Sequence, residues 1–142
     1  MKKELDDKLV ETFPIIYRDR YGDMRQTCMV WGFSYSDGWF QLTWDLSEKL
    51  EEIAKAQPKP KDGEEDCRLK AVQMKEKFGT IRAYFNYSSP EVDAIIDEAE
   101  EKSAKTCETC GEPGQLRNYR GWYITLCDKD WDEYRKERES RS

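Results

Sequence analysis

The chain lacks histidine altogether, lacks any long apolar run, and carries an odd number of cysteines, five, among its 142 residues. Without histidine, Ser-His and Cys-His nucleophilic sites and zinc sites of the histidine-rich hydrolase kind are excluded. Because a membrane helix needs about 20 apolar residues, none is predicted, and the charged start MKKELDDKLV lacks the apolar centre of a signal peptide. An odd cysteine count argues against a disulfide framework. We therefore expect a cytoplasmic protein with reduced thiols and no membrane partner.

What the chain does contain is charge and aromatic rings. Charged residues make up 38% and aromatic residues 13%, and the net charge is −6. Aromatic content of this kind predicts a folded chain rather than a disordered one. The acidic balance disfavours general binding of duplex DNA. The length fits a single domain, which we divide into a core over about 3–105, a zinc-knuckle subdomain over about 106–131 and a frayed charged tail over about 136–142.

The pattern of apolar residues predicts an α+β fold with two or three helices packed on a small antiparallel sheet. We expect a helix over 3–13, a buried strand over 28–35, a turn at 36–38 in which Ser36 or Asp37 caps the next helix, and that helix over 39–56. The stretch 57–66 is polar and broken by proline, so it is predicted to be a loop.

Residues 68–87 are predicted to form a β-hairpin that turns at Gly79. Val72 and Met74 are expected to share one face with the apolar residues of the second strand, whereas the opposite face is expected to carry Gln73, Lys75, Arg82 and Tyr84. The spacing of Ser88 and Glu91 predicts a capping box at the start of a helix, and a final helix is expected over about 129–139.

The segment CETCGEPGQLRNYRGWYITLCDKD contains the most specific chemical signal. Cys107 and Cys110 form a C-x-x-C pair, and Cys127 follows a predicted strand, which is the order of a zinc ribbon. Asp130 stands where the fourth cysteine or histidine of a ribbon would be. We predict a structural zinc site held by Cys107, Cys110, Cys127 and Asp130, with three thiolates and one carboxylate.

Other interpretations of this segment stay open at the level of sequence. Asp128 is a second candidate for the oxygen ligand, water can fill the fourth position, and Cys28 or Cys67 can come from elsewhere in the chain. The site can also be empty, with the thiols acting as small buried apolar residues. A thioredoxin-like redox role is disfavoured because the motif lacks a βαβ context.

Three phrases of the chain together resemble a family of small uncharacterised proteins of tailed phages and prophages. They are YRDRYGDMRQTCMVWGFSYSDGWF, VQMKEKFGTIRAYF and CETCGEPGQLR followed by GWYITLC. In that family the third phrase usually ends on another cysteine or a histidine, whereas this chain ends on CDKD. The resemblance implies phage accessory biology and a folded domain that carries a zinc knuckle, and it covers the chain from about residue 13 to 127.

Two further groups of residues are candidate binding surfaces. Arg18, Arg20 and Arg25 lie in sequence among aromatic residues, including Trp39, and Lys75 and Arg82 lie on the hairpin with Tyr84. Arginine or lysine beside aromatic rings suits an anionic, flat ligand such as a nucleotide. The ordinary alternative is a solvated charged face and arginines that pair with the abundant carboxylates.

The leading functional hypothesis is a non-enzymatic, phage-type accessory protein that binds a host protein, such as a component of a defence or transcription system. In this hypothesis zinc rigidifies the segment around Arg117 and Trp122 as a binding epitope. A second hypothesis is a binder of a nucleotide or of single-stranded nucleic acid. A metal-dependent nuclease is a third and weaker one, because no carboxylate and lysine constellation stands out.

Overall fold

A computed structural model of the chain describes residues 1–22 and 27–141. Four α-helices are present in this part of the chain: α1 (Lys3–Thr12), α2 (Phe40–Lys55), α3 (Pro90–Ser103) and α4 (Asp128–Glu139). Two short 3-10 helices, η1 (Cys28–Trp31) and η2 (Asp37–Trp39), precede α2. One sheet contains β1 (Phe33–Ser34), β2 (Ala71–Lys77) and β3 (Thr80–Phe85), and a second contains β4 (Gln115–Tyr119) and β5 (Trp122–Leu126). The predicted α+β class is therefore confirmed.

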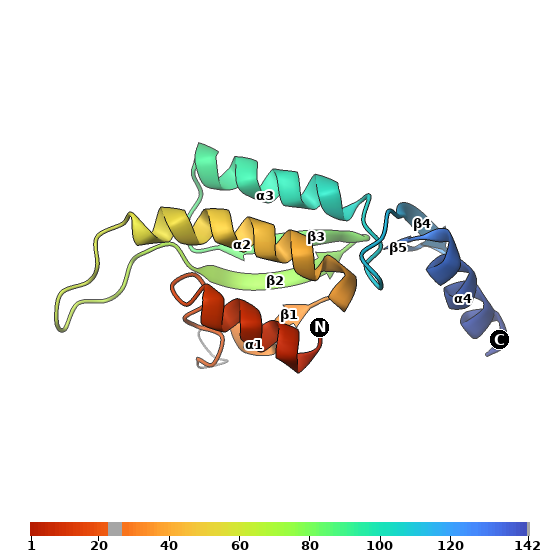
Figure 1. The fold of residues 1–142 in the computed structure, drawn as a ribbon, viewed down its shortest axis with the longest axis horizontal. Coiled ribbons are helices and arrows are strands. Elements are labelled where there is room, and N and C mark those ends of the chain that lie inside the picture. Colours follow the sequence, from red (N-terminus) through yellow and green to blue (C-terminus); the bar gives the residue numbers. More distant parts are fainter. Residues whose placement is uncertain (23–26, 142) are drawn as a thin grey trace.

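The three-stranded sheet is mixed rather than antiparallel. β2 and β3 form the predicted hairpin, but the two-residue β1 pairs with β2 in parallel, with Phe33 opposite Met74. Helices α2 and α3 lie side by side over the sheet, and α1 runs beside β1 (Figure 1). The main core lies between these layers and includes Leu9, Trp39, Leu50, Met74 and Ile81, all at most 2% exposed.

The predicted strand over 28–35 is wrong for most of its length. The side chain of Thr27 accepts a hydrogen bond from the backbone N–H of Met29 and caps η1. Gly32 then adopts a φ of 72°, and a Cβ at this position would lie 2.6 Å from a carboxylate oxygen of Asp6. The chain therefore coils tightly and becomes extended only at Phe33 and Ser34.

Two predicted helix caps are also shifted. Ser36 makes no side-chain cap, and Asp37 instead accepts a hydrogen bond from the backbone N–H of Lys2 while η2 leads into α2. At α3 the cap is Ser89 rather than Ser88, because the Ser89 hydroxyl accepts the backbone N–H of Val92. The helices themselves lie where their apolar periodicity predicts them.

A β-bulge adjusts the predicted register of the hairpin. Ala71 lies opposite Phe85 and Gln73 opposite Tyr84, so Val72 is the extra residue between them. Ala71 and Met74, rather than Val72 and Met74, are the buried residues of β2. The predicted opposite face is confirmed, since Gln73 pairs with Tyr84 and Lys75 with Arg82.

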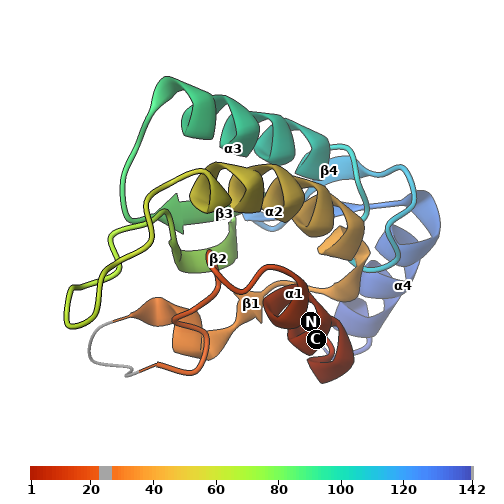
Figure 2. The same cartoon turned by 60° about the vertical axis from the view of Figure 1, so that its left-hand side comes forward.

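The C-terminal lobe, residues 106–141, lies at one end of the molecule and contains the second sheet and α4 (Figures 1 and 2). In the described residues of this lobe the buried side chains are those of Cys107, Glu108, Thr125 and Leu126. Helix α4 has no buried residue. It packs on the β4–β5 hairpin, where the rings of Trp131 and Tyr134 contact the ring of Tyr119. The lobe therefore has little apolar core of its own.

Candidate metal centre

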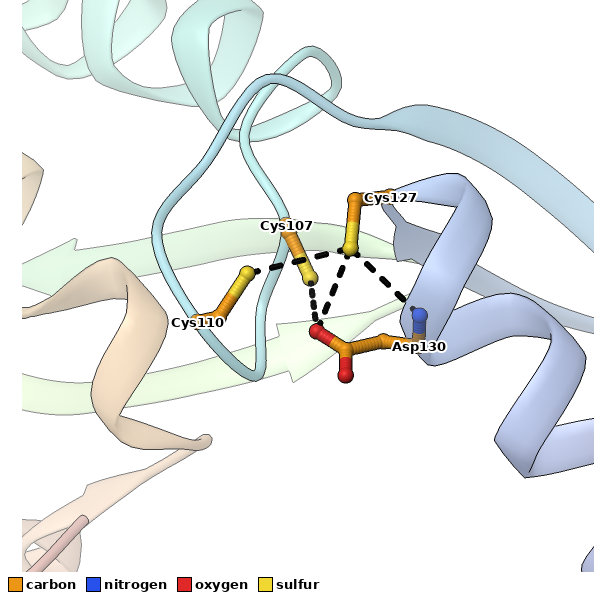
Figure 3. A group of neighbouring side chains, drawn as sticks. All are labelled: Cys107, Cys110, Cys127 and Asp130. Atoms are coloured by element: carbon orange, nitrogen blue, oxygen red, sulfur yellow. Dashed lines mark hydrogen bonds between the residues drawn. The ribbon is translucent and has the colours of Figure 1, made fainter.

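Three thiols and one carboxylate converge where the C-terminal lobe meets the rest of the molecule. Cys107 and Cys110 lie in the turn that follows α3, Cys127 follows β5, and Asp130 lies in the first turn of α4. Their side chains point toward one another (Figure 3), and their ligand atoms all lie within 4.8 Å of each other. These four side chains lie close enough to bind a metal ion.

The distances between the ligand atoms suit a tetrahedral ion. The sulfur atoms of Cys110 and Cys127 are 3.8 Å apart. A zinc ion with zinc–sulfur distances of about 2.3 Å separates two tetrahedral sulfur ligands by about 3.8 Å. One carboxylate oxygen of Asp130 lies 3.2 Å from the Cys107 sulfur and 3.3 Å from the Cys127 sulfur. Small side-chain movements would therefore complete the coordination.

The C-x-x-C turn is fixed by backbone hydrogen bonds. The carbonyl oxygen of Cys107 accepts the N–H of Gly111, and the N–H of Cys107 donates to the carbonyl oxygen of Glu112. Gly111 adopts a φ of 82°, a conformation that strongly favours glycine. The chain thus curls back, so that the buried Cys107 and the exposed Cys110 face the same point.

Cys127 and Asp130 are positioned by the start of α4. Cys127 is the N-cap residue, and its sulfur accepts the backbone N–H of Asp130 at 3.4 Å. Amide dipoles at a helix start favour negative charge, so this position suits the carboxylate of Asp130. Asp128, the alternative oxygen ligand, is instead bound by the guanidinium of Arg117 at 2.7 Å. The geometry therefore selects Asp130 over Asp128.

Burial and hydrogen bonding shift the pKa values of three groups in the cluster, Cys107, Cys110 and Asp130. Burial raises the pKa of the Cys107 thiol. At Cys110 the backbone at Glu112 acts to lower the thiol pKa, but desolvation and the neighbouring Asp130 and thiols outweigh it and raise the pKa to about 12. Hydrogen bonds from Cys107 and Cys110 lower the pKa of Asp130. Hydrogen bonds from the thiols to the Asp130 carboxylate thus join the groups of the cluster. A divalent cation can take the place of the thiol protons, because metal binding releases them.

The C-x-x-C turn, which we also call the metal-ligand turn, packs against the segment that joins β1 to α2. The backbone N–H of Gly38 donates to the carbonyl oxygen of Glu108 at 2.8 Å, and the N–H of Ser36 donates to the Glu108 carboxylate at 3.1 Å. The indole N–H of the fully buried Trp39 donates to the carbonyl oxygen of Thr106 at 2.9 Å. Burial raises the pKa of Glu108. Trp39, predicted as a binding residue, therefore has a structural contact here.

Within the part of the chain that the structure describes, Cys107, Cys110, Cys127 and Asp130 form the only group of cysteine and acidic side chains that could hold a metal ion. Neither Cys28 nor Cys67 belongs to it. Cys28 and Cys67 are exposed and free. The alternative in which a distant cysteine completes the site therefore has no support from the geometry.

The arginines predicted as a ligand-binding group have protein partners. Arg18 donates four hydrogen bonds to backbone carbonyl oxygens, including those of Ile15 and Leu69. Arg20 pairs with the buried Asp6 and also donates to the carbonyl oxygen of Val30. These contacts favour the structural interpretation of both side chains. Arg25 lies outside the described residues.

The predicted residues of the hairpin lie together on one face of β2 and β3. Arg82 pairs with Glu100 of α3 at 2.9 Å, and the ammonium of Lys75 lies 5.9 Å from the ring centre of Tyr84. The predicted epitope residues differ in availability, since Arg117 is bound to Asp128 whereas Trp122 is 61% exposed. The structure therefore brings Lys75, Arg82 and Tyr84 together and leaves Trp122 at another surface.

Sequence reasoning missed a surface made where two hairpin turns meet. Four large apolar residues with exposed fractions from 41% to 62% lie there, and we call them the tip surface: Phe78, Trp122 and Tyr123 line a cavity, and Leu116 lies against Gly79. A cavity of about 380 Å³ opens between the turns, lined by Glu76, Lys77, Phe78, Gly121, Trp122 and Tyr123. The turn at Gly79 is held against strand β5, because the Thr125 hydroxyl donates to the Gly79 carbonyl oxygen at 2.7 Å.

Both turns place a residue other than glycine in the left-handed region. Phe78 and Gly79 have φ of 55° and 85°, and Arg120 and Gly121 have φ of 52° and 88°. Positive φ at both central residues is the pattern of a type I′ turn, which prefers asparagine, aspartate or glycine first. An exposed phenylalanine in this conformation is costly to the fold, and such strain is concentrated at functional sites.

No helix in the described ranges is long and apolar enough to cross a membrane. The chain matches no protein-family model, no curated protein and no solved structure.

Proposed function

We propose that the protein is a non-catalytic binding module of the phage accessory type, in which a zinc ion holds the C-terminal lobe and the tip surface binds a host protein. The observation that carries this proposal is the tip surface itself, because Phe78 and Trp122 are more than 60% exposed at the turn ends of the two hairpins. A component of a host defence or transcription system is the proposed partner, and inhibition of that component is the proposed consequence.

Zinc is the metal that the ligands support best. Three thiolates are soft ligands that favour zinc over magnesium, calcium or manganese, and the 3.8 Å separation of two sulfur atoms suits its tetrahedral geometry. With Asp130 as the fourth ligand, no position remains for a water molecule to be activated. A structural role therefore fits better than a catalytic one.

The tip surface suits recognition of a protein. Trp and Tyr are enriched among the residues that dominate binding energy at protein interfaces, and Phe and Met accompany them in interface cores. Thr125 connects strand β5 to the turn at Gly79 through its hydrogen bond, so metal loss in the C-terminal lobe would also disturb the surface. Two of the sequence segments on which the family resemblance is based contain residues of this surface: VQMKEKFGTIRAYF contains Phe78, and GWYITLC contains Trp122 and Tyr123.

Metal analysis tests the zinc site. The intact protein, prepared without chelator, should carry about one zinc ion per chain by native mass spectrometry and elemental analysis. A double variant Cys110→Ser and Cys127→Ser should carry none, whereas Cys28→Ser, which alters an exposed cysteine outside the cluster, should keep the full content. Wild-type protein without any bound metal would refute the site.

Capture from a bacterial host lysate tests the partner. Wild-type protein should retain one host protein in a fixed ratio, and Trp122→Ser should lose it. Trp31→Ser is the matched control, because Trp31 is 67% exposed but lies in η1, outside the tip surface. Binding should then be reproduced with the purified partner by calorimetry. Equal capture by wild type and Trp122→Ser, or no partner in a fixed ratio, would count against the proposal.

A further inference from the structure

We infer that the outer face of the three-stranded sheet is a second binding site, and that its ligand is single-stranded nucleic acid. The strand register places seven residues of β1, β2 and β3 on this face: Ser34, Gln73, Lys75, Lys77, Thr80, Arg82 and Tyr84. The two proposed sites share Phe78, but Lys75, Arg82 and Tyr84 lie outside the tip surface, so variants at these positions test this site separately.

Charge on the outer face has the opposite sign to that of the whole chain. The face carries the cations Lys75, Lys77 and Arg82 and no carboxylate from its strands, although the chain has a net charge of −6. Arg82 is neutralised by Glu100 of α3. Lys75 and Lys77 approach aromatic rings, and their ammonium groups are available to an anionic ligand. Charge complementarity therefore favours an anion on this face.

Two pairs of a lysine and an aromatic ring follow one another along β2. The ammonium of Lys75 lies 5.9 Å from the ring centre of Tyr84, and that of Lys77 lies 5.4 Å from the ring centre of Phe78. Tyr84 is 43% exposed and Phe78 62% exposed. Each pair offers a flat surface for a base and a cation for a phosphate. Repeated stacking surfaces along a basic groove are the usual features of single-strand binding.

The chemistry distinguishes a single strand from other anions. A duplex keeps its base faces stacked internally, so the rings of Tyr84 and Phe78 would gain nothing from it. A mononucleotide can use one pair at a time, whereas a strand can use both. An acidic peptide would satisfy Lys75 and Lys77 and leave the rings without a stacking partner. The arrangement therefore favours a strand of at least two nucleotides over these alternatives.

Fluorescence anisotropy with a labelled twelve-residue oligothymidylate tests the inference. The wild-type protein should bind the probe at low salt, and log K should fall with log salt with a slope of about −1.4, which corresponds to two phosphates on a single strand. Neither thymidine monophosphate nor a twelve-residue polyglutamate should displace the probe at equal molar concentration. Equal displacement by the nucleotide or by the acidic peptide would overturn the assignment to a strand.

Matched variants locate the site. Lys75→Glu with Lys77→Glu should weaken binding by at least about tenfold, whereas Lys59→Glu with Lys61→Glu, which makes the same change in net charge at exposed loop residues, should alter it by less than about threefold. Tyr84→Ala should weaken binding by about tenfold and Tyr84→Phe should preserve it, because stacking requires only the ring. Equal losses in both lysine pairs, or no loss in Tyr84→Ala, would refute the site.

The two proposed sites can fail separately. Trp122→Ser should lose the host protein and still bind the oligonucleotide, whereas Tyr84→Ala should show the reverse. Wild-type protein that does not bind the oligonucleotide at low salt would refute this inference and leave the proposed protein partner unaffected. Thermal melting of each variant ensures that a lost signal does not reflect unfolding.

Discussion

Gly38 lies directly against the backbone of Cys107. A Cβ placed on Gly38 would be 2.2 Å from the Cys107 carbonyl oxygen and 2.4 Å from that of Glu108. Both clashes are with backbone atoms, which cannot move aside as a flexible side chain can. The docking of the metal-ligand turn on the segment before α2 thus depends on the absence of a side chain at one position.

Substitution of this glycine should separate the lobe from the core. We expect Gly38→Ala to lower the free energy of unfolding by about 1–3 kcal/mol, the usual cost of overpacking, and to weaken metal binding. Urea unfolding and metal competition measure the two effects. Gly63→Ala, where no atom lies within 4 Å of the added Cβ, should leave metal affinity unchanged. Unchanged metal binding in Gly38→Ala would contradict the docking argument.

Removal of the metal should unfold the C-terminal lobe alone. The buried side chains in its described part are few, so the ligand bonds have little apolar packing to support them. Hydrogen exchange should become at least about tenfold faster in β4 and β5 after chelation. Protection in β2 and α2, which belong to the main core, should change little. Uniform exchange throughout the chain would instead indicate one cooperative unit.

The carboxylate ligand can be exchanged for a better one. We expect Asp130→Cys to bind zinc more tightly than the wild type, because a fourth thiolate matches this ion better than a hard oxygen does. Asp130→Ala should bind zinc at least about tenfold more weakly. Competition with a coloured chelator measures both. Asp128→Ala is the control, since Asp128 is held by Arg117 outside the cluster, and an equal loss there would contradict the choice of ligand.

Phe78 should be a position where stability can be gained. Phe78→Asn places a residue that tolerates a positive φ first in the type I′ turn, and we expect it to raise the free energy of unfolding by about 1 kcal/mol. Arg120→Asn, at the equivalent position of the other turn, should act in the same direction. Urea unfolding measures both variants. Destabilisation by Phe78→Asn would show that the ring supports the fold.

Acid should weaken the ion pairs by which Asp66, in the loop before β2, holds Arg18 and Arg68. The Arg68 guanidinium lowers the pKa of Asp66 to about 2 despite partial desolvation, and Arg18 adds to this effect. Because the native pKa lies below the ordinary value of 3.8, the ionised group stabilises the native state above that value, and this contribution is lost as the pH falls through about 2. The melting-temperature difference between wild type and Asp66→Asn should therefore shrink from pH 4 to pH 2. A difference that stays constant over this pH range would contradict it.

Local sequence patterns were enough to predict the helices, the β2–β3 hairpin and the three cysteines of the cluster. The period of Leu42, Leu46 and Leu50 marks α2, and the C-x-x-C spacing with Cys127 marks the cluster, because both depend on residues close in sequence. Asp130 and Asp128 could not be separated from sequence, since the choice depends on where Arg117 reaches across the hairpin.

Features that depend on distant contacts could not be predicted in the same way. Arg18 donates to the backbone around residues 66–69, about 50 positions away, and no composition rule indicates such a partner. The tip surface requires the turn at Phe78 to meet the strand that begins at Trp122. The strand expected over 28–35 failed because Gly32 approaches Asp6 and bends the chain.

The loop between α2 and β2 projects at the opposite end of the molecule from the C-terminal lobe (Figure 1). Cys67 in this loop is exposed and free, and it lies outside the ligand cluster. If zinc binds the thiols of Cys107, Cys110 and Cys127, the Cys28→Ser variant would leave Cys67 as the single accessible thiol for a maleimide dye. A fluorophore in this loop would lie at the end of the molecule opposite the C-terminal lobe, so binding of the proposed host protein could be followed by fluorescence without labelling that lobe.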